Sequence, residues 1–271
     1  MAFSSNLGRC PIIGDDNYEQ FVVETGSQGG EGMKGYEPRD YEKWPEGSLN
    51  FCAPFDMPLI PESEWEDRIE KKEKDKSRLS DVWKLQDLPV LSQGRTNYCW
   101  MNGVIHAMMA LRAANNQPFV SLSPASAAAK IKNYKNKGGW GGEAVEGINE
   151  YGVCNTDLWP ANSIERRYDT DESRKNADLH RMPEWFDLDD RNDKEVATCL
   201  LSNLPVPAGY NWWGHLICLL DLLYLGNGKY GYLFINSWGA NWGDHGFGIL
   251  KDRKMTPDGA VAPRTTTISR K

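Results

Sequence analysis

The first sixty residues lack the apolar periodicity that marks regular secondary structure. Residues 1–60 show neither helical nor strand spacing of apolar positions. They are rich in Gly, Pro and isolated aromatic residues, as in GSQGGEGMKGYEPRDYEKWPEG. This pattern predicts an extended N-terminal arm over 1–60.

A charged helix or linker is expected over 61–84. In PESEWEDRIEKKEKDKSRLSDVW, Trp65 and Ile69 recur at helical spacing, Ser63 is placed as an N-cap, and Glu66 stands where a capping box needs it. The many charges around them are typical of a solvated helix face rather than of a binding site.

A helical region is predicted over 85–190. The apolar positions of CWMNGVIHAMMALRAA fall on one stripe, which predicts a helix buried along one side, with Asn97 as N-cap and Cys99 in the first turn. Two further helices are predicted by SPASAAAKIKNYKN and GGEAVEGINEYGV, because each is followed by glycine.

The last part of the chain, 191–271, has a strand-like pattern after one more helix at DKEVATCLLSN. Short apolar or aromatic runs, namely VPAGY, HLICLLDLLYL, KYGYLFINS and GFGILK, are separated by Gly and Asn, and LGNGK reads as a hairpin turn. Helices followed by strands predict an α+β fold with two unlike halves: a helical lobe over 85–190 and a β lobe over 191–271.

Composition limits the partners and the chemistry. Against 31 basic residues there are 38 acidic ones, which gives a net charge of -7, and no long basic block occurs, so a nucleic-acid partner is not expected. No apolar run approaches the length of a membrane span, and the N-terminus lacks a signal-peptide core, so neither a membrane partner nor export by a cleaved signal is expected.

The six cysteines are widely spaced and are expected to be reduced. Since no C-x-x-C or H-x3-H pair is present, no metal and no other cofactor is expected.

Cys99 is either a nucleophile or a small buried hydrophobe, and its neighbours must decide. A reactive thiolate needs a cation or a helix N-terminus beside it. Among the four histidines, His106 lies about 10 Å further along the same helix, whereas His180 and His245 stand in polar segments and are expected in surface or turn roles. His215 begins a buried strand, where a polar side chain needs a reason.

Two amides could complete such a site. Asn236 ends an apolar strand and could hold an imidazole in its productive tautomer. Gln93, with the backbone N–H of Cys99, could donate hydrogen bonds to a developing oxyanion.

Three stretches resemble the papain-like cysteine peptidases. QGRTNYCW resembles the Gln-Gly-to-Cys-Trp block, GWGGEAVEGINEYGV the glycine loop and its helix, and INSWGANWGDHGFGILK the Asn-Ser-Trp-Gly segment. The resemblance extends over about 85–251. The family carries His and Asn roughly 130–150 residues after the Cys. Here Asn236 fits that spacing, while His215 comes early and is preceded by Gly214 instead of the usual Asp or Asn.

The resemblance implies a two-lobed fold in which the helical lobe carries the Cys and an antiparallel, barrel-like β lobe carries the His and Asn. It implies that Cys99 is the nucleophile, His215 the general base and then acid, Asn236 the orienting residue and Gln93 the oxyanion donor.

Five further residues are assigned to the site by the same resemblance. Gly141 and Gly142 would line the substrate cleft through their backbone, and Trp238, Gly239 and Trp242 would support the site. Trp238 in particular would shield the His–Asn hydrogen bond from water.

The functional hypotheses left open differ in what residues 1–84 do. The first is a thiol peptidase that hydrolyses peptide bonds of a protein or peptide substrate through an acyl-enzyme. The second is a structural or binding component of a larger assembly, such as a phage virion, with the arm as tether. In the third, residues 1–84 are an inhibitory pro-segment, released by acid or by cleavage between Asn50 and Leu85. The expected location is the cytoplasm, or the virion if the chain is phage-encoded.

Overall fold

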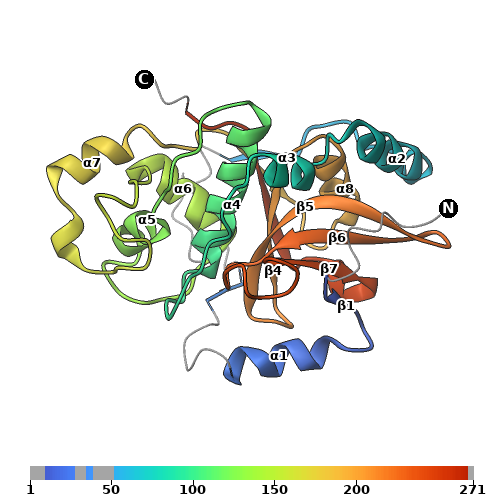
Figure 1. Cartoon of the computed structure of the whole chain (residues 1–271), viewed down its shortest axis with the longest axis horizontal. Helices are drawn as coiled ribbons and strands as arrows, with labels where there is room; N and C mark the ends of the chain where they lie inside the picture. Colours follow the sequence, from blue (N-terminus) through green and yellow to red (C-terminus); the bar gives the residue numbers. More distant parts are fainter. Residues whose placement is uncertain (1–9, 28–34, 39–51, 268–271) are drawn as a thin grey trace.

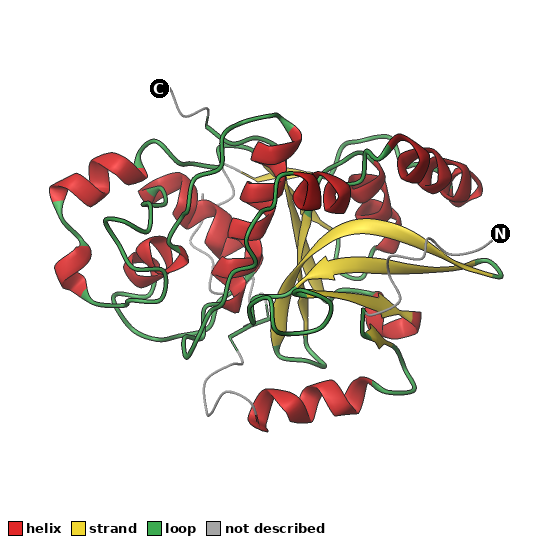
Figure 2. Cartoon of the chain, viewed as in Figure 1, coloured by secondary structure: helices red, strands yellow, loops and turns green. Residues whose placement is uncertain are grey.

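The computed structural model describes residues 10–27, 35–38 and 52–267. In Figure 1 one group of helices gathers on the left and the strands form a twisted sheet on the right, with further helices beside the sheet, as the colours of Figure 2 also show. This is the expected α+β arrangement with a helical part and a β part.

The helices of the described residues follow the expected order, with additions. They are α1 (Tyr18–Ser27), α2 (Trp65–Asp75), α3 (Leu79–Leu85), α4 (Cys99–Ala114), α5 (Pro124–Ile131), α6 (Gly141–Tyr151), α7 (Asp171–Ala177) and α8 (Asp193–Leu201), with short 3-10 turns at η3 (Glu62–Glu64), η4 (Arg166–Tyr168) and η5 (Asp252–Met255).

The strands form one sheet in the order β1-β7-β6-β5-β4-β8-β3-β2. They are β1 (Ile12–Ile13), β2 (Cys52–Pro54), β3 (Trp185–Leu188), β4 (Val206–Tyr210), β5 (His215–Gly226), β6 (Lys229–Ile235), β7 (Phe247–Lys251) and β8 (Gly259–Pro263). The central strands pair antiparallel, and the two outermost, β1 on β7 and β2 on β3, pair parallel.

The predicted helices α4, α5, α6 and α8 and the predicted strands β4 to β7 are confirmed. However, α4 is buried on almost every side rather than along one stripe, because it lies between the sheet and the other helices. Gly103 makes this possible, since a Cβ there would overlap the side chain of Leu216 on β5.

The arm is not extended throughout, contrary to the sequence prediction. Part of it forms α1, and β1 and β2 at its two ends pair with the sheet of the same chain. The sheet also takes β3 from within 85–190, the range expected for the helical lobe. Edge strands gain backbone partners by such pairing. These contacts join residues far apart in sequence, so the local periodicity of the chain cannot predict them.

Two predicted caps are wrong by a residue or more. Ser63 lies in η3 and α2 begins only at Trp65, with Glu64 as N-cap and no capping side chain. Helix α4 is preceded by Tyr98 rather than by Asn97 as N-cap. The prediction that Cys99 lies in the first turn of this helix is confirmed.

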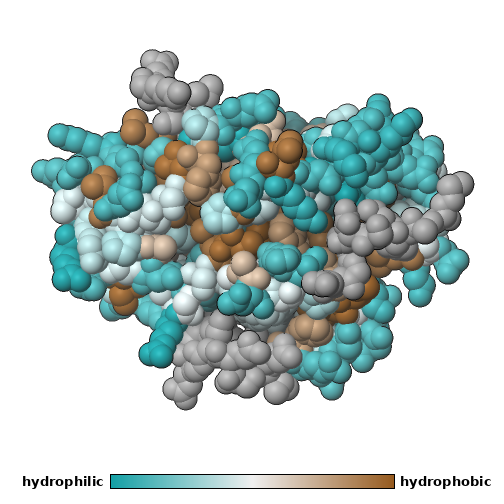
Figure 3. All heavy atoms as spheres, in the orientation of Figure 1, coloured by the Kyte–Doolittle hydropathy of each residue, from teal (hydrophilic) through white to brown (hydrophobic). Residues whose placement is uncertain are grey.

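The segment that carries α2 and α3 belongs to the body of the protein. Trp65 and Ile69 are buried in the core of the β part, and the Lys72 ammonium donates to the Leu200 carbonyl at 2.8 Å and to Asn203 Oδ1 at 2.5 Å. Figure 3 shows the outer face of α2 as hydrophilic, in keeping with its expected solvated side, while hydrophobic atoms gather in the middle of the view.

Candidate active site

Cys99 lies fully buried at the first position of α4. The backbones of Leu216, on β5, and of Gly35, in the arm, lie close to its sulfur and favour the thiolate. Burial outweighs them and raises the pKa of the Cys99 thiol to about 12. In this state the sulfur is a neutral thiol, held beside the residue that follows His215.

His215 and Asn236 are joined by a hydrogen bond across neighbouring strands. His215 begins β5, Asn236 follows β6, and these strands pair antiparallel. The distance from His215 Nε2 to Asn236 Oδ1 is 2.8 Å. The imidazole is fully buried, and burial lowers its pKa to about 4 although the Asn236 bond favours the charged form. The other ring nitrogen, Nδ1, is buried and has no hydrogen-bond partner among the described residues.

Gln93 ties the segment before Cys99 to the segment after Asn236. Its side chain is fully buried, its Nε2 donates to the Thr96 carbonyl at 2.8 Å, and its Oε1 accepts from the Ser237 hydroxyl at 2.7 Å. Its backbone N–H also donates to the Ser237 carbonyl at 2.8 Å. One amide hydrogen beyond the Thr96 bond is available, as an oxyanion donor requires.

Indole rings enclose the His–Asn pair. Trp238 stacks on the imidazole of His215 with centroids 4.7 Å apart and an angle of 30° between the planes. Trp242 meets Trp238 edge-on at 5.7 Å. Gly239, between them, has φ of 77°, in the left-handed region that favours glycine. Of the three expected support residues, Trp238 therefore contacts the imidazole and Trp242 contacts Trp238.

The arm crosses this site at residues 35–38. The Gly139 N–H donates to the Gly35 carbonyl at 2.8 Å, and the Glu37 N–H donates to the Gly139 carbonyl at 2.9 Å. The Tyr36 N–H donates to the carbonyl of Gly214, next to His215, at 3.3 Å. Thus an extended segment of the arm is hydrogen-bonded on one side to the helical part and on the other to the β part.

Gly139, not Gly141 or Gly142, presents its backbone to this segment. Gly141 and Gly142 form the first turn of α6 and are buried there, and a Cβ on Gly142 would overlap the ring of Trp140. The cleft role expected for Gly141 and Gly142 stays a prediction. The neighbouring Gly139 of the same glycine-rich loop was not among the expected site residues.

Tyr36 is a second residue that the sequence did not reveal. Its side chain is 9% exposed, and its ring fills the space over Gly209 on β4, where a Cβ would overlap it. The only local signal is Pro38, which favours an extended backbone in the residue before it.

The other histidines stand apart. Nε2 of His106 accepts the backbone N–H of Leu91 at 3.0 Å. His180 stands in a turn, which agrees with one of the two roles expected for it, but it is buried rather than at the surface and lies 3.1 Å from Arg112. His245 lies exposed in a turn with φ of 53°, as expected.

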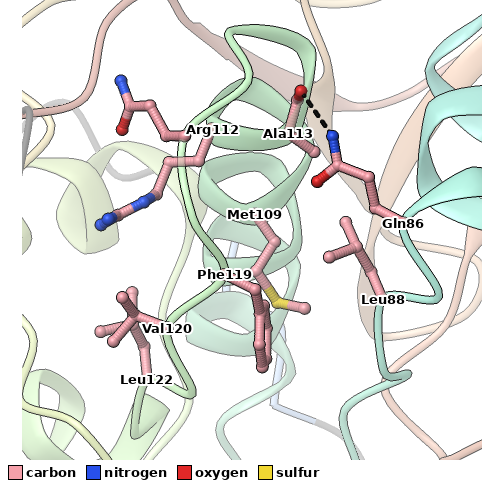
Figure 4. Close-up of a pocket in the computed structure, with 9 residues that line it drawn as sticks. Gln86, Leu88, Met109, Arg112, Ala113, Phe119, Val120 and Leu122 are labelled. Atoms are coloured by element: carbon pink, nitrogen blue, oxygen red, sulfur yellow. Dashed lines mark hydrogen bonds between the residues drawn. The ribbon is translucent and has the colours of Figure 1, made fainter.

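A small cavity lies at the far end of α4 (Figure 4). Met109, Arg112 and Ala113 line it with residues such as Phe119, and its volume is ≈ 10 Å³, about that of one water. Because Met109 is ten residues after Cys99 in the helix, the cavity lies about 15 Å from the thiol. It is too small and too distant to take a peptide substrate.

In the parts of the chain that the structure describes, no group of three His, Cys, Asp or Glu side chains could hold a metal ion. Within the same residues, no helix is long and apolar enough to cross a membrane. The five cysteine side chains described are free and buried.

The chain is similar to known proteins in sequence and in structure. No protein-family model matches it. Xylellain, a cysteine protease from Xylella fastidiosa, superposes with a TM-score of 0.57 at 17% identity, over 87% of this chain and 97% of xylellain. Digestive procathepsin L 3 of Tenebrio molitor larval midgut gives a TM-score of 0.56 at 16% identity, over 91% and 79% of the two chains.

The chain has the papain-like fold. Ananain from Ananas comosus adds a similarity in sequence, 24% identical over 178 residues. The alignment covers 58% of this chain and about half of the length of ananain. The resemblance to the papain-like cysteine peptidases is therefore confirmed, and the expected α+β architecture with it.

Proposed function

We propose that the protein is a papain-like thiol peptidase that hydrolyses peptide bonds through Cys99, His215 and Asn236. The observation that carries the proposal is the buried His215–Asn236 hydrogen bond beneath Trp238, beside a thiol at the N-terminus of a helix. A helix N-terminus favours an anion and so favours the thiolate.

The reaction divides into two steps. His215 accepts the Cys99 proton as the sulfur attacks the substrate carbonyl, and the Cys99 N–H and Gln93 stabilise the oxyanion. His215 then protonates the departing amine, which leaves an acyl-enzyme. A water molecule, deprotonated by His215, hydrolyses the thioester and restores the thiol. Asn236 keeps the imidazole in the required tautomer throughout.

We infer that residues 35–38 hold this site in a latent state. An extended substrate would need the N–H and carbonyl of Gly139, and both are taken by Gly35 and Glu37. The segment also completes the burial of Cys99. With the thiol pKa at about 12 and the imidazole pKa at about 4, both groups are neutral and the thiol is a poor nucleophile.

Latency in this form needs only the displacement of a short segment. Cleavage between Asn50 and Leu85 was the sequence-based expectation, but α2 and α3 occupy half of that range and are packed into the body. Separation of residues 35–38 from Gly139 and Gly214 would by itself free the backbone groups and admit water.

The substitution Gly35→Val tests the proposal in the full chain. A Cβ on Gly35 would overlap the carbonyl oxygen of Asn97, so the segment cannot remain in place. We expect the variant to be labelled at Cys99 by an epoxide inhibitor of thiol peptidases at least tenfold faster than the wild type, as measured by mass spectrometry. Pro38→Ala is the matched control, because Pro38 is exposed in the same segment.

Two further variants in the Gly35→Val background separate the possible results. Labelling must vanish with Cys99→Ala and slow strongly with His215→Ala. An opened chain that reacts no faster at Cys99 than at other thiols would refute the peptidase. Equal labelling of the wild type and Gly35→Val would refute the latent state alone.

The alternative of an assembly component with the arm as tether stays a prediction, as does a phage origin. The described ends of the arm pair with the sheet of their own chain, at β1 and at β2. This arrangement favours an internal role for the arm.

A further inference from the structure

Trp213 packs against the imidazole of His215 from the short turn that joins β4 to β5. The backbone N–H groups of Trp213 and Gly214 donate to the Tyr210 carbonyl at 3.1 and 2.8 Å, and Gly214 has φ of 62°. This tight turn places the indole back beside the residue two positions later. The two ring centroids are 5.2 Å apart and the planes lie at 66°.

The Trp213 ring is held rigidly. It is 1% exposed, stacks on Trp212 at 5.1 Å with an angle of 9°, and meets Phe234 and Trp238 edge-on at 6.0 and 5.6 Å. Since Trp238 also stacks on His215 at 4.7 Å, the imidazole has two indole centroids within the range over which an aromatic ring attracts a cation.

The charged groups that could stabilise a protonated His215 lie far from it. The His215 pKa responds to burial and to the Asn236 bond, and no carboxylate among the described residues acts on it. Asp221, further along β5, binds Leu79 and Ser80 of α3. Glu37 of the arm lies at Gly138.

The remaining neighbours of His215 give no negative charge either. Cys99 of α4 is a neutral thiol in this state, and Lys254 on η5 lies against Trp212, 5.4 Å from that ring. A buried imidazolium therefore depends on the neutral Asn236 oxygen and on the rings.

We propose that Trp213 is a positioning residue that, together with Trp238, packs the imidazole of His215 against a pair of indoles in mutual contact and stabilises its protonated form. This proposal rests on the proposed role of His215, which must carry a proton after Cys99 ionises and when the amine leaves. Trp213, on the turn that precedes His215, thus offsets part of the free energy that burial of the imidazolium costs.

The test lowers the electron density of the indole ring and leaves its shape nearly unchanged. Tryptophan, monofluoro- and difluorotryptophan are incorporated at position 213 of the full chain by nonsense suppression, with the same series at Trp185 as control. Trp185 is equally buried and makes no ring contact with a histidine in the described structure. Fluorine weakens cation attraction with little change in size.

The first readout is the protonated fraction of His215, taken from its ¹⁵N resonances between pH 7 and 3, a window that includes its pKa of about 4. We expect a stepwise fall of the His215 pKa with fluorination at 213, by roughly 0.5 to 1.5 units in all, and none with fluorination at 185. A series at 213 as flat as that at 185 overturns the proposal and leaves Trp213 as packing alone.

The second readout is the pH dependence of Cys99 labelling in the Gly35→Val background, whose profile should move in the same order along the series. If that background is not labelled, the proposed peptidase fails. The resonance titration still decides the role of Trp213, so the two failures are distinguishable.

Discussion

The carboxylate of Asp221 should be a major source of stability, because it caps a helix from a distant strand. Asp221 on β5 is 1% exposed, and its two oxygens accept the backbone N–H groups of Leu79 and Ser80 at 3.0 and 3.2 Å. These are the first residues of α3, whose N–H groups have no partners within the helix. The charge also favours the helix N-terminus.

The magnitude follows from what each substitution leaves unsatisfied. Asp221→Ala buries two N–H groups without acceptors, at about 1–3 kcal/mol each, so the free energy of unfolding should fall by about 3–5 kcal/mol. Asp221→Asn keeps one acceptor and loses the charge, and should cost roughly half as much. For a chain of this size, 3 kcal/mol corresponds to a fall in Tm of about 6–12 °C.

Urea unfolding at pH 7 measures the effect, since a stability change shifts the midpoint and leaves the slope unchanged. Asp67→Asn on the exposed face of α2 is the control and should change stability by about 0.5 kcal/mol at most. If Asp221→Ala destabilised the chain by less than about 1 kcal/mol, the cap would be unimportant. Such a result would also contradict the inference that α3 is a fixed part of the body of the protein.

Two further predictions concern the site and the response to acid. In the Gly35→Val background, Asn236→Ala should slow labelling of Cys99 by about tenfold or more, because the imidazole loses its orienting bond; an unchanged rate would contradict the role given to Asn236. Burial lowers the pKa of His106 to about 3, so the unfolded chain binds a proton that the folded chain does not as pH falls from 6.5 towards 3. Stability should therefore fall with pH in that window, by about 2 kcal/mol at pH 5 for this group, and urea unfolding of His106→Gln should show that much less loss between pH 6.5 and 5.

Local pattern predicted the elements with strong periodicity. Helices α4, α5, α6 and α8 and strands β4 to β7 carry their own spacing and turn signals, so they could be found without knowledge of their partners. The arm could not be predicted in the same way, because β1 and β2 are too short to show a period and depend on pairing with distant strands.

The candidate site also contains residues that the sequence could predict and residues that it could not. Its order along the chain pointed to Cys99, His215 and Asn236, and the His–Asn hydrogen bond is present. The segment at Tyr36 could not be found, because the fit depends on Gly139 and Gly209, which are far apart in sequence. Trp213 was noted only as a bulky residue near the base. Its packing against the imidazole follows from the turn at Gly214, not from composition.

Under the proposed roles, the arm would control reactivity by two means that act together. It occupies the Gly139 backbone groups that a peptide needs, and it keeps water from a thiol with a pKa of about 12 and an imidazole with a pKa of about 4. Opening hydrates both groups, which lowers the first pKa and raises the second, so the proton moves more easily to His215 exactly when the backbone groups become free. The equilibrium between closed and open arm therefore sets substrate access and nucleophile strength at once. A single substitution at Gly35 should raise both.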